Sequence, residues 1–282
     1  MHYPMKRLFF ILAVIGCISS NAQYYYKDII GTSETAITLQ TYMKNKVNRV
    51  SLNSFDADGT KSEAFFVSQI FNPSQKTLQT ITKSGVSDES ILLSFINANG
   101  QVVKTIDSNQ KLVSTALYQY AENGSLTNVT LISTDSSKAF SQVEEHLWQY
   151  ENGKVKRMVR VKNKVDTIYI QFKLDDAGNV IEEQSVRNGK VSDPVYYYYD
   201  AQNRLTDIVR FNNKAKRLLP EYMFEYSASN QVIQKITVPS NGSQYLIWRY
   251  QYDERGLKIK EAIYNKQKQL TGKIEYLYSF GS

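Results

Sequence analysis

The chain has 282 residues, of which 42% are hydrophobic and 22% are charged, and these values are ordinary for a globular protein with a sizeable core. Its 5 Pro and 13 Gly exclude a collagen-like or disordered chain, and its dispersed formal net charge of +7 is too mild to indicate a nucleic-acid partner. Tyrosine is the outlier at 21 residues, with 12 Phe beside it, and aromatic residues favour β-strands because their bulk packs well on a pleated surface.

Residues 1–22 have the features of a secretory signal peptide, because two basic residues precede an apolar run at 8–15 that is too short to span a bilayer. Small residues follow, and cleavage after Ala22 fits the pattern of small residues at such sites. In a second interpretation, residues 14–17 resemble a bacterial lipobox, and Cys17, the only cysteine, then carries a lipid anchor. No later segment is apolar enough to cross a membrane. We therefore expect an exported protein without a transmembrane segment.

One short helix is predicted near residues 33–45. Ser33 is a suitable N-cap, Glu34 favours the positive end of the helix dipole, and three apolar residues fall on one face. These three are Ala36, Leu39 and Met43. We expect this helix to cover one open end of a β-sheet, which is a common way to protect an edge strand.

From about residue 47 to 282, one motif recurs at a spacing of roughly 25 residues, which is typical of repeat architectures. Each copy has two aromatic or apolar residues two positions apart, followed by a polar turn that ends in Gly or Asn. Well-formed copies are Tyr118-Gln119-Tyr120 ending at Gly124, Trp148-Gln149-Tyr150 at Gly153, Phe172-Lys173-Leu174-Asp175 at Gly178, Phe224-Glu225-Tyr226 at Asn230, and Tyr250-Gln251-Tyr252-Asp253 at Gly256.

A second turn signal follows about ten residues after each first one, because Asn and Gly tolerate the positive φ that tight hairpins need. Examples are Asn163-Lys164, Asn188-Gly189, Asn212-Asn213, Asn241-Gly242 and Asn265-Lys266. Each repeat is therefore predicted to form two strands. The fold class that we expect is all-β with one short N-terminal helix: an antiparallel hairpin meander of ~25-residue repeats that forms a large twisted or curled sheet, in a single domain over 23–282.

The motif Tyr-x-Tyr-Asp-x-x-Gly followed by Leu resembles the YD repeat of Rhs-type bacterial surface and toxin-shell proteins. The closest copies are Tyr197-Tyr199-Asp200-Asn203-Arg204-Leu205 and Tyr250-Tyr252-Asp253-Gly256-Leu257. The whole chain after residue 22 is similar to small YD-repeat proteins exported by Gram-negative bacteria. In Rhs proteins such repeats are β-hairpins that wind into a shell around a toxin. This chain has too few repeats to close a shell, no toxin domain after them and no Pro-x-Gly self-cleavage region, so the resemblance implies the fold but not encapsulation.

A basic strand is the most suggestive surface feature of the sequence. Val155, Val159 and Val161 are predicted to share its apolar face. The opposite face is predicted to carry Lys154, Lys156, Arg160, Lys162 and Lys164. This face is our candidate binding site for anionic envelope polymers or lipid headgroups. The alternative is a solvated strand face whose lysines discourage aggregation.

Catalytic chemistry finds little support in the sequence. His146 is the only histidine after His2, so no Cys-His pair and no second His are available, and we expect a structural or surface role for it. The acid pairs Asp175-Asp176 and Asp253-Glu254 have the residue types of a glycosidase. They recur at one position of the repeat, however, where Asp accepts hydrogen bonds from turn amides.

Signals for a metal site and for a glycan site are weak in this sequence. Residues 56–60 imitate the start of a calcium loop, but the twelfth position is Val67 rather than Glu, so a tight turn is the better interpretation. In the run Tyr196–Tyr199, alternate side chains point away from the core, and a sugar-stacking face is an alternative there. We expect no catalytic residues, no metal and no cofactor.

These observations predict an exported non-enzymatic binding or scaffolding protein of the bacterial cell envelope, located in the periplasm, at the outer-membrane surface or outside the cell. Its expected partner is an envelope protein or glycan, with a lipid anchor if Cys17 is acylated. The alternative is a carboxylate-dependent glycan hydrolase of the envelope or exterior.

Overall fold

The computed structural model describes residues 25–63, 65–84, 87–109, 111–135, 137, 139–239 and 244–281. The expected signal peptide, Cys17 and the turn at Asn241-Gly242 lie outside these described residues. Among the residues that are described, no helix is long and apolar enough to cross a membrane.

One helix precedes a long series of strands. The helix is α1 (Lys27–Lys44). The strands are β1 (Val47–Asp56), β2 (Phe66–Asn72), β3 (Thr77–Ser84), β4 (Ser87–Ile96), β5 (Val102–Ser108), β6 (Leu112–Tyr120), β7 (Leu126–Asp135), β8 (Ser141–Glu151), β9 (Lys154–Lys162), β10 (Asp166–Leu174), β11 (Val180–Arg187), β12 (Lys190–Val191), β13 (Val195–Tyr199), β14 (Leu205–Asn212), β15 (Arg217–Tyr226), β16 (Val232–Thr237), β17 (Leu246–Tyr252), β18 (Lys258–Tyr264) and β19 (Leu270–Phe280).

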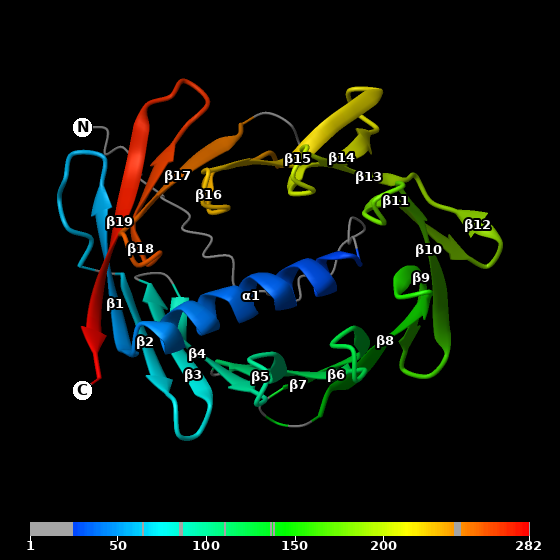
Figure 1. The fold of residues 1–282 in the computed structure, drawn as a ribbon, viewed down its shortest axis with the longest axis horizontal. Coiled ribbons are helices and arrows are strands. Elements are labelled where there is room, and N and C mark those ends of the chain that lie inside the picture. The colour runs from blue at the N-terminus through cyan, green and yellow to red at the C-terminus, as the bar shows by residue number, and fades with distance from the viewer. Residues whose placement is uncertain are drawn as a thin grey trace.

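The strands form a closed antiparallel barrel (Figure 1). Apart from β12, each strand pairs with the next strand of the wall, and β1 also pairs with β19, in a register that includes Leu52 opposite Tyr276. The short β12 pairs only with β11. Strand β11 also pairs with β13, so β12 is not part of the closed wall, which has 18 strands. The expected open twisted or curled sheet is therefore wrong. Closure joins the two edge strands, and their unpaired backbone groups find partners in each other.

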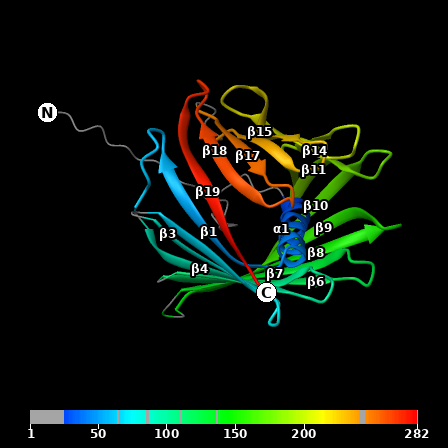
Figure 2. The ribbon, with the colours of Figure 1, turned by 60° about the vertical axis from the view of Figure 1, so that its left-hand side comes forward.

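Helix α1 lies inside the barrel and crosses its lumen (Figures 1 and 2). The prediction of a helix at 33–45 that covers a sheet edge is wrong in both its start and its position. Ser33 lies within the helix and does not cap it. Thr32 and Thr35 turn their hydroxyls back onto the carbonyls of Asp28 and Gly31, so these residues continue the helix instead of starting it.

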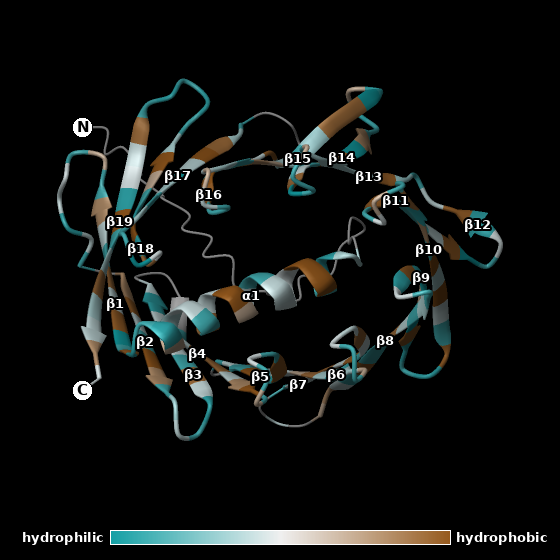
Figure 3. Ribbon diagram, viewed as in Figure 1, coloured by the Kyte–Doolittle hydropathy of each residue, from teal (hydrophilic) through white to brown (hydrophobic). Residues whose placement is uncertain are grey.

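The hydrophobic core is where the wall touches the helix. Near its C-terminus, Leu39 and Tyr42 pack against Val50 and Val67 of β1 and β2. Near its N-terminus, Tyr25 joins a cluster on β7 to β10 that includes Trp148, Met158 and Ile170. Figure 3 shows hydrophilic and hydrophobic residues alternating along many wall strands, as a wall with an inner and an outer face requires.

The repeat motif builds one end of the barrel. Because the strands alternate in direction, the motif turns at 97–101, 121–125, 175–179, 200–204, 227–231 and 253–257 all lie at the same end, which we call the motif end. The second set of turns lies at the opposite end, which we call the hairpin end.

The second aromatic of the motif has a repeated structural role. In six copies its hydroxyl donates a hydrogen bond of 2.7–2.9 Å to the carbonyl of the first residue of a return strand. These pairs are Tyr120 to Val102, Tyr150 to Leu126, Tyr199 to Val180, Tyr226 to Leu205, Tyr252 to Val232, and Tyr278 to Lys258. Each bond joins neighbouring hairpins, so the tyrosines connect repeats instead of stabilising one repeat alone.

Candidate functional site in the lumen of the barrel

A buried carboxylate holds the N-terminus of α1. Glu183 on β11 is 3% exposed, and its carboxylate accepts hydrogen bonds from the backbone N–H groups of Tyr25 and Tyr26, at 2.8 and 2.9 Å. It also accepts a hydrogen bond of 2.8 Å from the hydroxyl of Tyr197. Burial raises the pKa of Glu183, while the three donors oppose that rise. An acid at this position suits the positive end of the helix dipole and fixes where the helix begins.

A chain of alternating charges, the ionic chain, runs from α1 along the wall toward the hairpin end. Its members are Asp28, His146, Glu144, Arg160, Asp166 and Arg187. His146 is fully buried and lies between Asp28 of the helix and Glu144 of its own strand, with 2.9 Å between its Nε2 and Glu144 Oε1. Arg160 then bridges Glu144 and Asp166 at 2.7 and 3.0 Å.

Neighbouring members of the ionic chain keep one another in the charged form. Burial alone lowers the pKa of His146, but Asp28 and Glu144 outweigh it and raise the pKa to about 9. Burial alone raises the pKa of Glu144, but His146 and Arg160 lower it to about 2. At neutral pH, His146 is therefore an imidazolium between two carboxylates, and it ties the helix to the wall as a structural histidine.

Another face of α1 carries the exposed residues Glu34 and Ile37, and Lys235 and Lys258 of the wall lie near Glu34. We call the part of the lumen between this face and strands β15 to β18 the lumenal chamber. Its helix side consists of Glu34 and Ile37, and its wall side consists of Tyr222, Phe224, Lys235, Trp248, Tyr250 and Lys258 on β15 to β18. Ile37 is 60% exposed although the helix lies within the barrel, and the wall residues are only partly buried (Figure 1). Among the described residues, Leu39 and Tyr42 on another side of the helix are buried, whereas Ile37 is exposed.

Two lysines in the chamber differ in their partners. Lys258 forms an ion pair of 2.8 Å with Glu261, whose carboxylate also accepts a 2.6 Å hydrogen bond from Tyr276. The ammonium of Lys235 lies 5.1 Å from the ring centre of Tyr222, and no described carboxylate forms an ion pair with it. Burial lowers the pKa of Lys235, with Glu34 opposing, and burial raises the pKa of Glu34, with Lys235 and Lys258 opposing.

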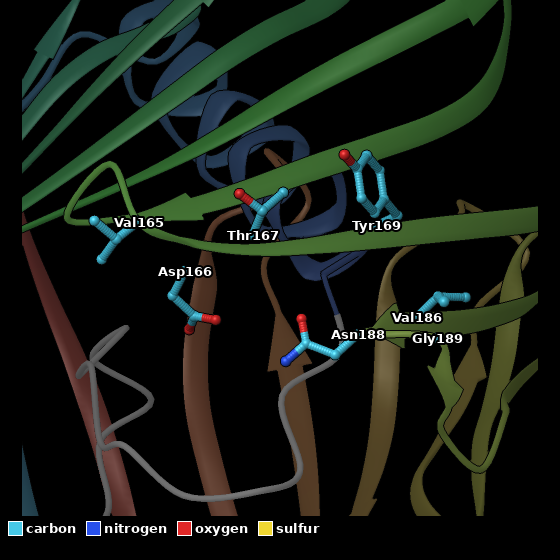
Figure 4. A pocket seen from close by; sticks show the side chains of 7 residues that line it. All are labelled: Val165, Asp166, Thr167, Tyr169, Val186, Asn188 and Gly189. Carbon is cyan, nitrogen blue, oxygen red and sulfur yellow. The ribbon is translucent and has the colours of Figure 1, made fainter.

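A second hollow lies at the hairpin end, with a volume of about 530 Å³ (Figure 4). It is lined by Val165, Asp166, Thr167, Tyr169, Val186, Asn188 and Gly189. Asp166 connects this hollow to the ionic chain, because its carboxylate binds both Arg160 and Arg187. The hollow is an open depression between the β9–β10 turn and the β11–β12 hairpin.

The five basic residues predicted to share one face do not lie together. A β-bulge opposite Gln149 and Tyr150 places both Lys156 and Arg157 on the outside, which inverts the faces of the rest of β9. Arg160 and Lys162 therefore lie on the lumenal side, opposite His146 and Glu144, and Val159 and Val161 lie outside. Lys156 pairs with exposed Glu151, Lys154 reaches the Asp176 carbonyl at the motif end, and Lys164 lies in a turn at the hairpin end with φ +61°.

Two of the four acids that are candidates for glycoside chemistry, Asp175 and Asp253, stabilise turns. Asp253 accepts hydrogen bonds from the N–H groups of Arg255 and Leu257, and Asp175 accepts one from Asn179, so the predicted turn role of these two residues is confirmed. The amides and the side chain of Arg255 lower the pKa of Asp253 against the effect of burial. Within the described part of the chain, no group of three or more His, Cys, Asp or Glu residues is arranged to hold a metal ion.

The tyrosine run Tyr196–Tyr199 alternates as its strand requires. Tyr197 is 1% exposed and binds Glu183, whereas Tyr198 is 50% exposed on the outer face. The loop at 56–60 is a tight turn in which Asp58 accepts a hydrogen bond from the N–H of Thr60.

Sequence reasoning missed Glu183, Asp28 and Lys235, the groups that organise the lumen. The residues next to them in the sequence indicate only weakly that these three side chains face the lumen. Lys235 is flanked by Ile233, Gln234 and Ile236, and only the bulge opposite Glu225 and Tyr226 decides that Lys235 faces inward. A strict two-residue alternation of inward and outward side chains therefore cannot predict that such a charged residue faces the lumen.

No protein-family model matches the chain, and no curated protein is significantly similar to it. Solved structures that match include the crystal structure of TcdB2-TccC3-Cdc42, at 17% identity over 77% of this chain and 11% of that chain, with a TM-score of 0.33. The Photorhabdus luminescens Tc holotoxin pore with a mutated TccC3 matches at 13% identity over 77% of this chain and 12% of that chain, with a TM-score of 0.34.

A porin-like protein from Bacteroides uniformis matches at 10% identity over 83% of this chain and 98% of that chain, with a TM-score of 0.39. The chain thus spans about a tenth of the two toxin chains and nearly the whole length of the porin-like protein. At these TM-scores the likenesses support no argument on function. The resemblance to YD-repeat proteins stays a prediction.

Proposed function

We propose that this protein is a non-enzymatic binding protein that holds a small amphipathic ligand in the lumenal chamber. One observation carries the proposal: inside a closed barrel, the apolar side chain of Ile37 is 60% exposed, one turn along α1 from Glu34, which lies near Lys235 and Lys258 of the wall. Pockets that bind small molecules are concave, mostly apolar and aromatic, and contain a few polar groups. The chamber has this composition, with Tyr222, Phe224 and Tyr250 on its wall.

A rigid frame supports this function. The Glu183 hydrogen bonds and the His146 ion pairs fix α1 on one side of the lumen. The tyrosine-to-carbonyl bonds join neighbouring hairpins around the wall. A chamber that is already formed loses little conformational entropy when a ligand enters, and this favours affinity.

The outer surface carries both ion pairs and exposed apolar side chains, the latter including Leu147, Tyr198 and Leu277, and the ion pairs favour contact with water. Its outward side chains include the ion pair between Lys173 and Glu182 and the one between Lys273 and Glu275, on different sectors of the wall. A barrel that faces lipid carries an apolar outward band about 25 Å tall, flanked by aromatic girdles. Outward ion pairs on β10, β11 and β19 do not suit such a band.

We place the protein in the cell envelope or outside the cell as part of this proposal, on the strength of residues 1–22. Deleting these residues is expected to move the protein from the exported to the cytoplasmic fraction, and an unchanged distribution contradicts export. Metabolic labelling with a fatty acid then separates the two forms. Label that disappears in Cys17→Ala supports the lipid anchor, and an unlabelled wild-type protein supports the soluble form.

Ligand binding in the chamber can be tested with N-phenylnaphthylamine, an uncharged aromatic probe that fluoresces in apolar sites. The protein is expected to bind it, and Ile37→Gln is expected to weaken binding about three- to tenfold, since it removes apolar contact area. Ile259→Gln is the matched control, because Ile259 is 40% exposed on the outer face of β18. Absence of probe binding, or equal effects of the two substitutions, contradicts the proposal.

A further inference from the structure

Two hydrogen-bond donors on the wall between β16 and β17 differ in burial, and neither has an oxygen acceptor among the described residues. The first is Lys235, which lies beside the rings of Tyr222 and Phe224 at 5.1 and 5.8 Å and has no carboxylate partner among the described residues. The second is the indole N–H of Trp248, which is buried and has no hydrogen-bond partner in the described chain. The two residues lie opposite each other on β16 and β17.

This arrangement has a cost at Trp248, because its buried indole N–H loses its hydrogen bonds to water without gaining an acceptor. The partly buried ammonium of Lys235 has contacts with two aromatic rings and the charge of Glu34, but no ion pair with a described carboxylate. The neighbouring lysine shows the usual remedy, because Lys258 pairs with Glu261 at 2.8 Å. Lys235 and Trp248 are both donors, so neither can satisfy the other, and an oxygen acceptor with negative charge satisfies both.

We propose that Lys235 and Trp248 bind the oxyanion of the ligand, a carboxylate, sulfonate or phosphate, while its apolar body lies between Ile37 and the aromatic wall. This inference rests on the proposed function, since it names the chemistry that the chamber selects. The rings of Tyr222 and Phe224 hold the Lys235 ammonium in place through cation–π contacts. Glu34, across the chamber on α1, limits the site to one anionic group, because a second anion would face its carboxylate.

A pair of probes isolates the anionic group. Anilinonaphthalene sulfonate and N-phenylnaphthylamine share the same rings, and only the first has a sulfonate. Wild-type protein is expected to bind the sulfonate probe at least about tenfold more tightly, as a charge-assisted hydrogen bond implies. Lys235→Met is expected to abolish this preference and to leave binding of the uncharged probe within about twofold, because Met fills a similar volume without a charge. Trp248→Phe is expected to reduce the preference in part.

Two further variants serve as controls. Lys235→Arg keeps the charge and is expected to keep the preference, and Lys260→Met removes a charge from the outer face of β18 and is expected to change neither probe. If both probes bind wild type equally, or if Lys235→Met keeps the preference, the oxyanion inference is wrong although the chamber is real. If neither probe binds wild type, the proposed function itself is wrong. Binding of the uncharged probe by Lys235→Met also reports that this variant is folded.

Discussion

The buried imidazolium of His146 predicts a loss of stability in mildly alkaline solution. Its pKa is raised from 6.5 to about 9 in the folded protein. A group whose folded pKa lies above its unfolded value contributes stability that is fully present below the unfolded pKa and is lost as the pH rises through the folded one. The window is therefore pH 6.5 to about 9. A shift of this size corresponds to on the order of 3 kcal/mol of unfolding free energy.

The perturbation is His146→Gln, which keeps hydrogen-bonding capacity but cannot become charged. We expect this variant to be less stable below about pH 9, because Asp28 and Glu144 lose their shared cation, and the difference to shrink as the wild-type imidazolium loses its proton. The diagnostic is the pH dependence. Between pH 6 and pH 10 the wild type is expected to lose on the order of 3 kcal/mol more unfolding free energy than the variant. Glu144, with a pKa of about 2, does not titrate in this window.

The assay is urea unfolding at a series of pH values for both proteins, with the midpoint and slope fitted together. Because the sequence holds only one other histidine, His2, the ring signals of His146 can also be followed by NMR titration. Parallel stability curves for the two proteins refute the reasoning. A His146 signal that titrates near its ordinary value of 6.5 refutes it independently.

Three further predictions concern the frame of the barrel. Glu183→Gln is expected to lower the free energy of unfolding in urea by about 2–4 kcal/mol, because one amide oxygen cannot accept all the hydrogen bonds that the carboxylate accepts. The control is Glu182→Gln, next to it on the outer face, which is expected to cost under about 1 kcal/mol. Equal effects of the two substitutions contradict the role of Glu183 at the helix N-terminus. Tyr252→Phe is expected to cost about 1 kcal/mol and exposed Tyr198→Phe about 0.5 kcal/mol or less, and the reverse order contradicts the carbonyl contact. Asp253→Asn is expected to keep the fold, since Asn accepts the same turn amides, and a folded variant that loses a measured glycan-hydrolase activity contradicts the turn assignment.

Local chemistry explains which parts of the fold could be predicted from the sequence. The motif turns are set by neighbouring residues, since Asp253 binds amides two and four positions ahead and Gly256 has φ +80°, which suits glycine. Such features are visible in a single repeat. Closure of the barrel is not visible there, because it depends on β1 and β19 meeting from opposite ends of the strand series.

The predictions that are wrong depend on contacts or bulges that a short stretch of sequence does not reveal. Ser33 resembles a helix cap, but the helix starts earlier because Glu183, more than 150 residues away, accepts the amides of Tyr25 and Tyr26. The face of β9 was predicted from a strict two-residue period, and one extra residue at the bulge inverted it. The lumenal chamber depends on both features, since the helix position and the bulges decide which side chains meet.

The pairing of β1 with β19 makes folding depend on contacts between distant parts of the chain. Residues such as Leu52 and Tyr276 must find each other across the whole series of strands, and closing a loop of roughly 220 residues costs about 5 kcal/mol in chain entropy. Folding dominated by such distant contacts is slow. Leu39 and Tyr42 of α1 belong to the same core cluster as Leu52 of β1 and Ile274 of β19, so docking of the helix and closure of the seam stabilise each other. A substitution that weakens the seam is therefore expected to loosen the helix in the lumen as well.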